Sequence, residues 1–172
     1  MNDRILSRGA MNLTSIGVIR SPFKQATGTP IQPCRAQGTE GRVELDPAWS
    51  EALKDLAGFD RIWLLYWFNR ASEARSLVVP YRDTVPHGLF ATRVPARPNP
   101  MGLSNVRLLG IEGEVLRVAD IDILDGTPLL DIKPYVPQYD NYPAAHCGWI
   151  DRVPDRPVVA DARFECETPQ GA

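Results

Sequence analysis

Two polar segments of the chain carry the side chains best suited to bind a ligand or move a proton. The first, residues 91–104, places Arg93 and Arg97 on a backbone stiffened by three prolines. A guanidinium can bind a carboxylate or phosphate through paired hydrogen bonds, or stack on a base, and the Asn99 amide can donate to and accept from a base edge. Proline lowers the entropy cost of holding such a loop in one shape. The segment fits either a binding loop or a surface loop with two solvated arginines.

The second segment is residues 125–135, which opens with an Asp-Gly pair typical of hairpin turns. Beyond the turn, Asp131 and Lys133 are two residues apart, so they share one face of a strand, and Tyr135 follows on the same face. A carboxylate, an amine and a phenol in this arrangement form either the polar wall of a pocket or a solvated face.

Cysteine and histidine give no sign of a metal site. The cysteines, Cys34, Cys147 and Cys166, form no Cys-x-x-Cys pair, and the histidines are His87 and His146. This scatter lacks the ligand spacing of zinc sites. Adjacent residues such as His146 and Cys147 rarely point the same way, which disfavours a catalytic pair. We expect a metal-free protein with reduced thiols, and hence a cytoplasmic location.

The charge balance excludes a protein whose whole surface binds nucleic acid. Lys and Arg number 19 against 21 Asp and Glu, a formal net charge of −2 at pH 7, whereas domains that depend on phosphate contacts are usually basic overall. Any nucleic-acid surface must be a local patch. No apolar run approaches the roughly 18 residues of a membrane span, and the N-terminus does not resemble a signal peptide, so we expect no membrane association.

The elements that must position these residues are short. The 16 prolines and 13 glycines disfavour long helices, because proline is excluded from helix interiors and central strands. Hydrophobic patterns predict strands over residues 13–20, 41–45, 61–68, 89–94, 104–111, 115–124, 129–135 and 158–164. The 61–68 run is almost continuously apolar, which predicts a strand buried on both faces. One helix is predicted from Asp46, a good N-cap followed by proline, to Leu56.

This element pattern predicts a mostly β protein, an antiparallel barrel or sandwich with one short helix and long proline- and glycine-rich loops. Strands do not alternate with helices, and neither phosphate-binding glycine motif is present, so a doubly wound nucleotide-binding sheet is excluded. Trp63, Tyr66 and Trp67 offer more apolar surface than one barrel face easily covers, which favours a homodimer.

Several motifs make the chain similar to a known family. They are Ile16-Gly17-Val18-Ile19-Arg20-Ser21-Pro22-Phe23, the strand 62–68, the run Phe90-Ala91-Thr92-Arg93 with Arg97-Pro98-Asn99-Pro100-Met101-Gly102-Leu103-Ser104, and Asp125-Gly126-Thr127-Pro128-Leu129-Leu130-Asp131-Ile132-Lys133-Pro134-Tyr135. In this order they closely resemble the TsaA-like family of S-adenosylmethionine-dependent tRNA methyltransferases, also called YaeB-like, VirR-like or TrmO. The resemblance covers residues 15–137.

The resemblance implies a single-sheet antiparallel β-barrel over residues 13–137. It leaves an N-terminal extension, 1–12, and a C-terminal segment, 138–172, that packs on or extends from the barrel without forming a separate domain. It implies S-adenosylmethionine as cofactor, no metal, and a homodimer whose subunits jointly wall the site. The activity it implies is N6-methylation of threonylcarbamoyl-adenosine beside the anticodon of tRNA.

An alternative is an S-adenosylmethionine-binding module, or a small-molecule methyltransferase, without tRNA activity. A basic patch beside the cofactor site would separate the two, since only a tRNA substrate needs one. On the tRNA hypothesis, the residues that must converge on the site are Arg61, Arg93, Arg97, Arg107 and Lys133.

By resemblance, the cofactor contacts fall in four parts of the chain. They are Ile31, Gln32 and Pro33; Phe68 and Asn69; Arg93 and Leu103; and Asp125, Gly126, Thr127 and Pro128. Many members have arginine where this chain has Ile31, and histidine where it has Asn69.

On the substrate side, the lone pair of an exocyclic adenine nitrogen is delocalised into the ring, so a hydrogen-bond acceptor beside it would help catalysis. We expect Asp131, Asn99 or a backbone carbonyl of the proline-rich loop to be that acceptor, and Tyr135 to stack on the base. Arg97 and Lys133 are expected to hold phosphate or the threonylcarbamoyl carboxylate.

Overall fold

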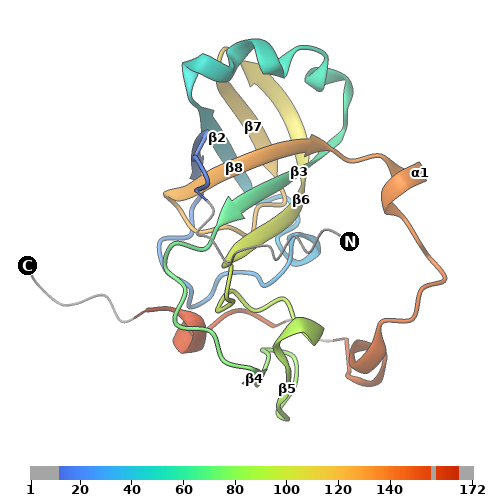
Figure 1. The fold of residues 1–172 in the computed structure, drawn as a ribbon. Coiled ribbons are helices and arrows are strands. Elements are labelled where there is room, and N and C mark those ends of the chain that lie inside the picture. Colours follow the sequence, from blue (N-terminus) through green and yellow to red (C-terminus); the bar gives the residue numbers. More distant parts are fainter. Residues whose placement is uncertain (1–11, 156–157, 167–172) are drawn as a thin grey trace, which may run out of the picture.

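The fold is built around one closed sheet. The computed structural model describes residues 12–155 and 158–166, and its main strands close into an antiparallel barrel in the order β1-β2-β7-β6-β3-β8 (Figure 1). The barrel strands are β1 (Gly17–Arg20), β2 (Glu40–Leu45), β3 (Arg61–Trp67), β6 (Met101–Glu112), β7 (Val115–Ala119) and β8 (Thr127–Pro134). The antiparallel barrel predicted from the sequence is confirmed. The expected extension 1–12 lies almost wholly outside the described residues.

The remaining elements are short. A two-stranded ribbon pairs β4 (Leu77–Val78) with β5 (His87–Gly88). The 3₁₀ helices are η1 (Pro33–Arg35), η2 (Pro47–Leu53), η3 (Leu56–Gly58), η4 (Leu89–Ala91), η5 (Gly148–Arg152) and η6 (Ala162–Phe164), and a single α-helical turn, α1 (Pro137–Asp140), follows β8.

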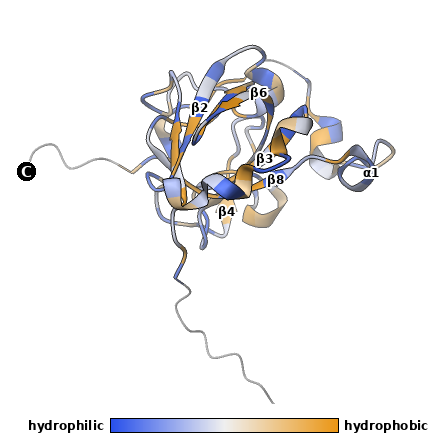
Figure 2. Cartoon of the chain, turned by 90° about the horizontal axis from the view of Figure 1, so that it is seen from above, coloured by the Kyte–Doolittle hydropathy of each residue, from blue (hydrophilic) through white to orange (hydrophobic). Residues whose placement is uncertain are grey.

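Strand β3 shows how the barrel forms its core. Ile62, Leu64 and Tyr66 are buried in the interior, at most 4% exposed, and they alternate with the half-buried Trp63 and Leu65. The predicted burial of this strand on both faces is wrong, because a single closed sheet encloses one apolar interior and leaves its other face outside. Figure 2 shows the hydrophobic residues along the strands that ring this interior, with α1 standing to one side.

One end of the barrel is covered by η2 and η3 (Figure 1). The Asp46 carboxylate accepts a hydrogen bond from the Ala48 N–H at 2.9 Å, as expected of an N-cap. The segment is nevertheless two 3₁₀ turns rather than the one helix predicted over 46–56, because the backbone is extended at Lys54 and left-handed at Asp55 (φ 66°). Leu53 and Leu56 pack on the barrel core.

The opposite end of the barrel is built from loops and holds the site. Val78, Leu89, Val94, Ala96 and Phe164 form a second small core there. The strands predicted over residues 89–94 and 158–164 are wrong, because both segments contain 3₁₀ turns where they pack here. Residues 89–94 begin as η4 because the Thr92 hydroxyl and N–H both donate to the Leu89 carbonyl, and residues 158–164 end as η6.

The C-terminal residues reach the same end by a long path. From α1 the chain runs along one side of the molecule and returns beneath the barrel (Figure 1), where Val159 pairs with Pro30 and Glu165 with Ala71. Within the described ranges, no helix has the length and apolarity to cross a membrane, and no group of three or more His, Cys, Asp or Glu side chains is placed to hold a metal ion.

Candidate active site

A cavity of about 730 Å³ opens at the loop end of the barrel, where β3 ends and β6 begins. Pockets of 300–1,000 Å³ are typical of sites for small ligands and cofactors. Its lining residues fall within 26–32, 66–71, 80–82, 90–97, 101–103, 122–124, 149–150 and 160–165, together with Thr127. The sheet therefore supplies a rigid floor, and loops from several other parts of the chain supply the rim.

Most of the predicted cofactor residues meet at this cavity. Those that line it are Ile31, Gln32, Phe68, Asn69, Arg93, Leu103 and Thr127. Gln32 and Arg93 also contact each other, since Nη1 of Arg93 donates to Oε1 of Gln32 at 2.8 Å. Segments more than sixty residues apart in sequence are thus joined at one site.

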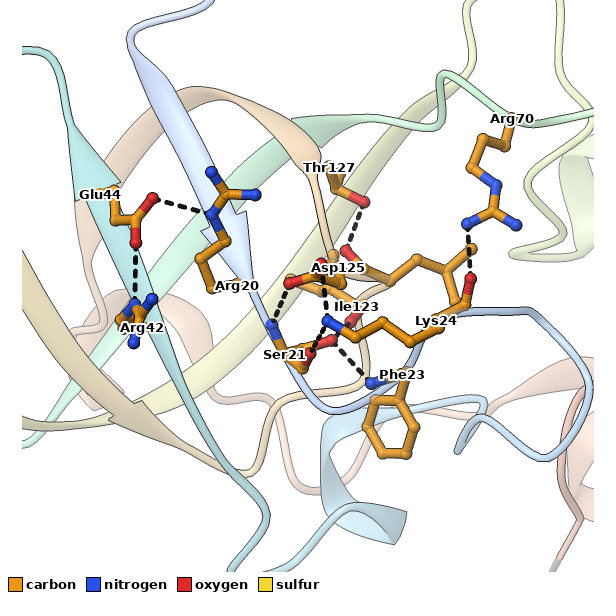
Figure 3. A network of polar contacts seen from close by, with 11 residues as sticks. Arg20, Ser21, Phe23, Lys24, Arg42, Glu44, Arg70, Ile123, Asp125 and Thr127 are labelled. Atoms are coloured by element: carbon orange, nitrogen blue, oxygen red, sulfur yellow. Dashed lines mark hydrogen bonds and ion pairs between the residues drawn. The ribbon is translucent and has the colours of Figure 1, made fainter.

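Four predicted cofactor residues, Pro33, Asp125, Gly126 and Pro128, are not among the lining residues. Asp125 faces away to a supporting network (Figure 3). Its carboxylate accepts a hydrogen bond from the Ser21 N–H at 3.1 Å and lies 2.8 Å from the Lys24 ammonium, which holds the pKa of Asp125 below its usual range.

The same network fixes the turn that carries Thr127. The Ser21 hydroxyl donates to the Ile123 carbonyl at 2.5 Å, and the Thr127 hydroxyl donates to the Leu124 carbonyl at 2.7 Å (Figure 3). Gly126 has φ 78°, a left-handed conformation that favours glycine. The Asp-Gly pair therefore positions Thr127 in the cavity wall without lining the cavity itself.

The residues predicted to assist the target amine lie outside the cavity of a single subunit. Asp131 and Lys133 form an exposed ion pair, 2.8 Å apart, on β8. The Tyr135 ring packs edge-on against Trp63, with ring centroids 5.8 Å apart, and Asn99 is exposed. The shared face of Asp131 and Lys133 is as predicted, but it is not a wall of this cavity. Arg97 does line it.

Sequence reasoning missed a polar chain at the cavity floor, formed by Tyr66, Ser104 and Asp122. The Ser104 hydroxyl donates to Oδ1 of Asp122 at 2.6 Å, and the Tyr66 hydroxyl lies 3.0 Å from Oγ of Ser104. Tyr66 and Ser104 are buried, and Tyr66 and Asp122 line the cavity. The sequence gives no sign of a polar role for Tyr66, because apolar residues surround it, and Asp122 lies outside the family motifs.

Burial sets the protonation of this chain. It raises the pKa of Asp122 to about 7, against a smaller opposite effect of the Ser104 hydrogen bond and the Arg93 charge. It also raises the pKa of Tyr66, so that hydroxyl stays protonated. The floor thus presents a carboxyl group that changes charge near neutral pH.

A basic patch is present, but with different members from those expected. Arg61 and Arg107 lie 3.1 and 3.2 Å from Oδ2 of Asp120, which is not a lining residue, and Lys133 is on the outer face of β8. The arginines that line the cavity are Arg70, Arg82, Arg93 and Arg97, against the acids Asp122 and Glu165. The local balance is therefore positive in a chain of net charge −2.

Comparisons with known proteins identify the family of this chain. Residues 18–141 match the family model described as the tRNA-methyltransferase O N-terminal domain. A probable S-adenosyl-L-methionine-binding protein of Pyrococcus abyssi is 53% identical over 137 residues, which are 80% of this chain and 74% of that protein. The tRNA (adenine(37)-N6)-methyltransferase of Escherichia coli K12 is 33% identical over 162 residues, 88% of this chain and 69% of that one.

A solved structure shares the architecture. The crystal structure of TrmO from Pseudomonas aeruginosa superposes with a TM-score of 0.69 at 41% identity, covering 81% of this chain. The match spans 62% of that longer chain. The motifs, the barrel and the matched length agree, and the chain belongs to the family of the tRNA-methyltransferase O N-terminal domain.

Proposed function

We propose that this chain is an S-adenosylmethionine-dependent methyltransferase that methylates N6 of threonylcarbamoyl-adenosine beside the anticodon of tRNA. Family membership supports the methyltransferase class and the cofactor, and the name of the Escherichia coli relative supports adenine 37 of tRNA as the target. The observation that carries the proposal is that most of the predicted cofactor residues line one cavity with four arginines around it. A tRNA substrate implies a cytoplasmic protein.

The residues present fit the cofactor. S-adenosylmethionine supplies an electrophilic methyl group on a positively charged sulfur, together with an ammonium, a carboxylate and an adenine. The cavity offers the Arg93 guanidinium to a carboxylate, and Phe68 and Leu103 as apolar surface for a ring. We assign these three residues to cofactor binding, together with Gln32, which holds Arg93 in place.

The tRNA reaches the cavity over the rim. Nη1 of Arg97 donates to the Thr92 carbonyl at 2.9 Å, and its guanidinium lies 5.8 Å from the centre of the Phe90 ring. Phe90 is 81% exposed although it lines the cavity. An exposed ring with a guanidinium beside it is a stacking surface for an unpaired base next to an anion site.

We also propose a homodimer. Trp67 and Met101 are cross-strand neighbours on β3 and β6, and each is 48% exposed. Leu103, 52% exposed, extends this apolar surface to the cavity. Tyr66, which the sequence grouped with it, is instead buried in the core. A second subunit placed there is the arrangement that would carry Asn99, Asp131 or Tyr135 to a partner's cavity.

Light scattering tests the assembly. We expect the mass of two chains at micromolar concentration, and Trp67→Glu should give the mass of one chain without loss of circular dichroism. A monomeric wild-type protein would contradict the dimer.

Nucleoside mass spectrometry tests the activity. Anticodon-loop tRNA from cells lacking the gene should accumulate threonylcarbamoyl-adenosine without the added methyl group, and purified protein with S-adenosylmethionine should restore it. Unmodified adenosine at the same position should be a poor substrate. If the protein binds the cofactor but tRNA from both strains is identical, the small-molecule or binding-module alternative is the correct one.

A further inference from the structure

The hydrogen bonds at the cavity floor have one direction. The Ser104 hydroxyl has a single proton, and it is donated to Oδ1 of Asp122. The Tyr66 hydroxyl, 3.0 Å from Oγ of Ser104, must then be the donor of that bond. The chain runs from Tyr66 through Ser104 and ends on the carboxylate. Among the described residues no other side chain donates to Asp122; its remaining hydrogen bond comes from its own backbone N–H.

An acid at this position is costly for the fold. Its neighbours Ile121 and Ile123 are at most 2% exposed and belong to the barrel core, and burying a carboxylate among apolar groups is unfavourable unless it is compensated. The Ser104 hydroxyl alone donates to Oδ1, and this hydrogen bond and the Arg93 charge offset burial only in part. A destabilising, hydrogen-bonded acid that faces a cavity is a pattern found at reactive sites.

We propose that Asp122 is the proton acceptor for methyl transfer in this cavity, and that Ser104 and Tyr66 hold its carboxylate in position. This inference rests on the proposed function. The target nitrogen forms a bond to the methyl carbon as the carbon–sulfur bond breaks, with that bond's electron pair remaining on sulfur. The nitrogen loses its proton to Oδ2 of Asp122, from which the proton passes to water.

Two further observations support this role. Burial raises the pKa of Asp122 to about 7, which suits a base that must take up and release a proton near neutral pH. The competing acid, Asp131, lies on the outer face of β8 in an exposed pair with Lys133. The other charged or titratable groups that face the cavity are Arg70, Arg82, Arg93, Arg97, Tyr81 and Glu165.

The test uses Asp122→Asn in the full chain, with tRNA from cells lacking the gene. The amide keeps the size of the carboxyl but cannot take the proton. We expect binding of S-adenosylhomocysteine, measured by calorimetry, to stay within about threefold, and single-turnover methyl transfer to fall about 10²- to 10⁴-fold. The wild-type rate of methyl transfer should rise with pH up to about 7. The residual rate of the variant should lack this pH dependence. Asp60→Asn is the matched control, because Asp60 is exposed, lies directly before β3 begins and does not line the cavity.

Two readouts separate a base from a structural acid. Carboxyl-carbon NMR should show one aspartate that titrates near neutral pH without cofactor, and Asp122→Asn should abolish it. Ser104→Ala and Tyr66→Phe remove parts of the chain, so each should move the pH profile to higher pH and lower the rate about tenfold, with unchanged S-adenosylhomocysteine binding.

The outcomes are distinct. An Asp122→Asn variant with wild-type rate and pH profile would show that the acid is structural, and one that no longer binds S-adenosylhomocysteine would show that it is a cofactor ligand. Either result overturns the inference and leaves the proposed function intact. A wild-type protein that transfers no methyl group to tRNA overturns both.

Discussion

The Tyr66 ring fills the space directly over Gly102, its cross-strand neighbour in the β3–β6 pair. A Cβ atom on Gly102 would overlap the ring, although the glycine backbone is not in the left-handed region. The missing side chain is what lets the Tyr66 hydroxyl reach Ser104, two residues further along β6. The cavity floor thus depends on a glycine within a motif whose other residues suggest only a loop.

Gly102→Ala should destabilise the protein by about 1–3 kcal/mol, because the Tyr66 ring must leave its position. It should also weaken S-adenosylhomocysteine binding, since both residues line the cavity. Denaturant unfolding and calorimetry measure the two effects. Gly110→Ala in the same strand is the control, because a Cβ there meets nothing within 4 Å, and it should change stability by no more than about 0.5 kcal/mol. Equal effects of the two variants would contradict the role of Gly102.

Arg93→Ala should weaken cofactor binding by about 1.5 kcal/mol, roughly tenfold, because a charge-assisted hydrogen bond is lost at the cavity rim. Arg93 is exposed, which places the expected loss at the lower end for such bonds. Calorimetry with S-adenosylmethionine measures it. Arg117→Ala, an exposed arginine on β7, is the control. An unchanged dissociation constant for Arg93→Ala would remove Arg93 from the cofactor side.

The stability of Asp122→Asn relative to wild type should depend on pH. The pKa of Asp122 is about 7 in the folded protein and about 3.9 in an unfolded chain, so between these values the folded state holds a proton that the unfolded state has lost. Wild-type stability therefore falls as pH rises from about 4 to 7, by up to about 1.4 kcal/mol per pH unit from this group.

The amide removes that dependence. Asp122→Asn should be more stable than wild type at pH 8, and this advantage should be clearly smaller at pH 5, as measured by thermal unfolding at both pH values. Asp83, Asp120 and Asp125 have lowered pKa values and act in the opposite direction, but they are common to both proteins and cancel in the difference. A stability difference that does not change with pH would show that Asp122 does not titrate near 7.

Asp131→Ala should leave cofactor affinity unchanged and alter stability by less than about 1 kcal/mol. Its ion pair with Lys133 is exposed, with the two side chains 43% and 60% accessible. Exposed ion pairs contribute little to the free energy of unfolding. Calorimetry and thermal unfolding check both statements, with Lys133→Ala as the second half of the pair. If methyl transfer nevertheless falls, Asp131 contacts the substrate from a partner subunit. Loss of cofactor binding would contradict the assignment of Asp131 to the substrate side.

Local patterns predicted a mostly β protein, and the family resemblance pointed to the barrel. The apolar run of β3 and the Asp-Gly turn are short-range signals, and Arg93 and Thr127, which the resemblance assigns to the cofactor, both line the cavity. Local patterns failed where tertiary packing decides the backbone. Thr92 bonds back to Leu89, and the left-handed Asp55 splits one predicted helix into two turns.

The cavity floor could not be predicted, because the register of strand pairing is what brings its side chains together. Tyr66, Ser104 and Asp122 come from β3, β6 and the segment after β7, and each looks ordinary in its own sequence context. Only the β3–β6 pairing, with Leu64 opposite Ser104 and Tyr66 opposite Gly102, brings the two hydroxyls together. A single sequence gives no signal for such an alignment, since strand pairing depends on residues distant along the chain.

Phe90→Ala should impair the use of tRNA while leaving the fold and the cofactor site intact. The ring is 81% exposed, so its removal should change stability by no more than about 0.5 kcal/mol. If a base stacks on it, its loss costs about 1–3 kcal/mol in the tRNA complex, and kcat/KM for tRNA should fall about fivefold to a hundredfold while S-adenosylhomocysteine binding is unchanged. Phe90→Trp should retain activity, because stacking needs a flat ring rather than phenylalanine itself. Leu77→Ala, at another highly exposed apolar side chain outside the cavity lining, is the control. Equal tRNA kinetics for Phe90→Ala and Leu77→Ala would remove Phe90 from the substrate side and place the base elsewhere on the rim.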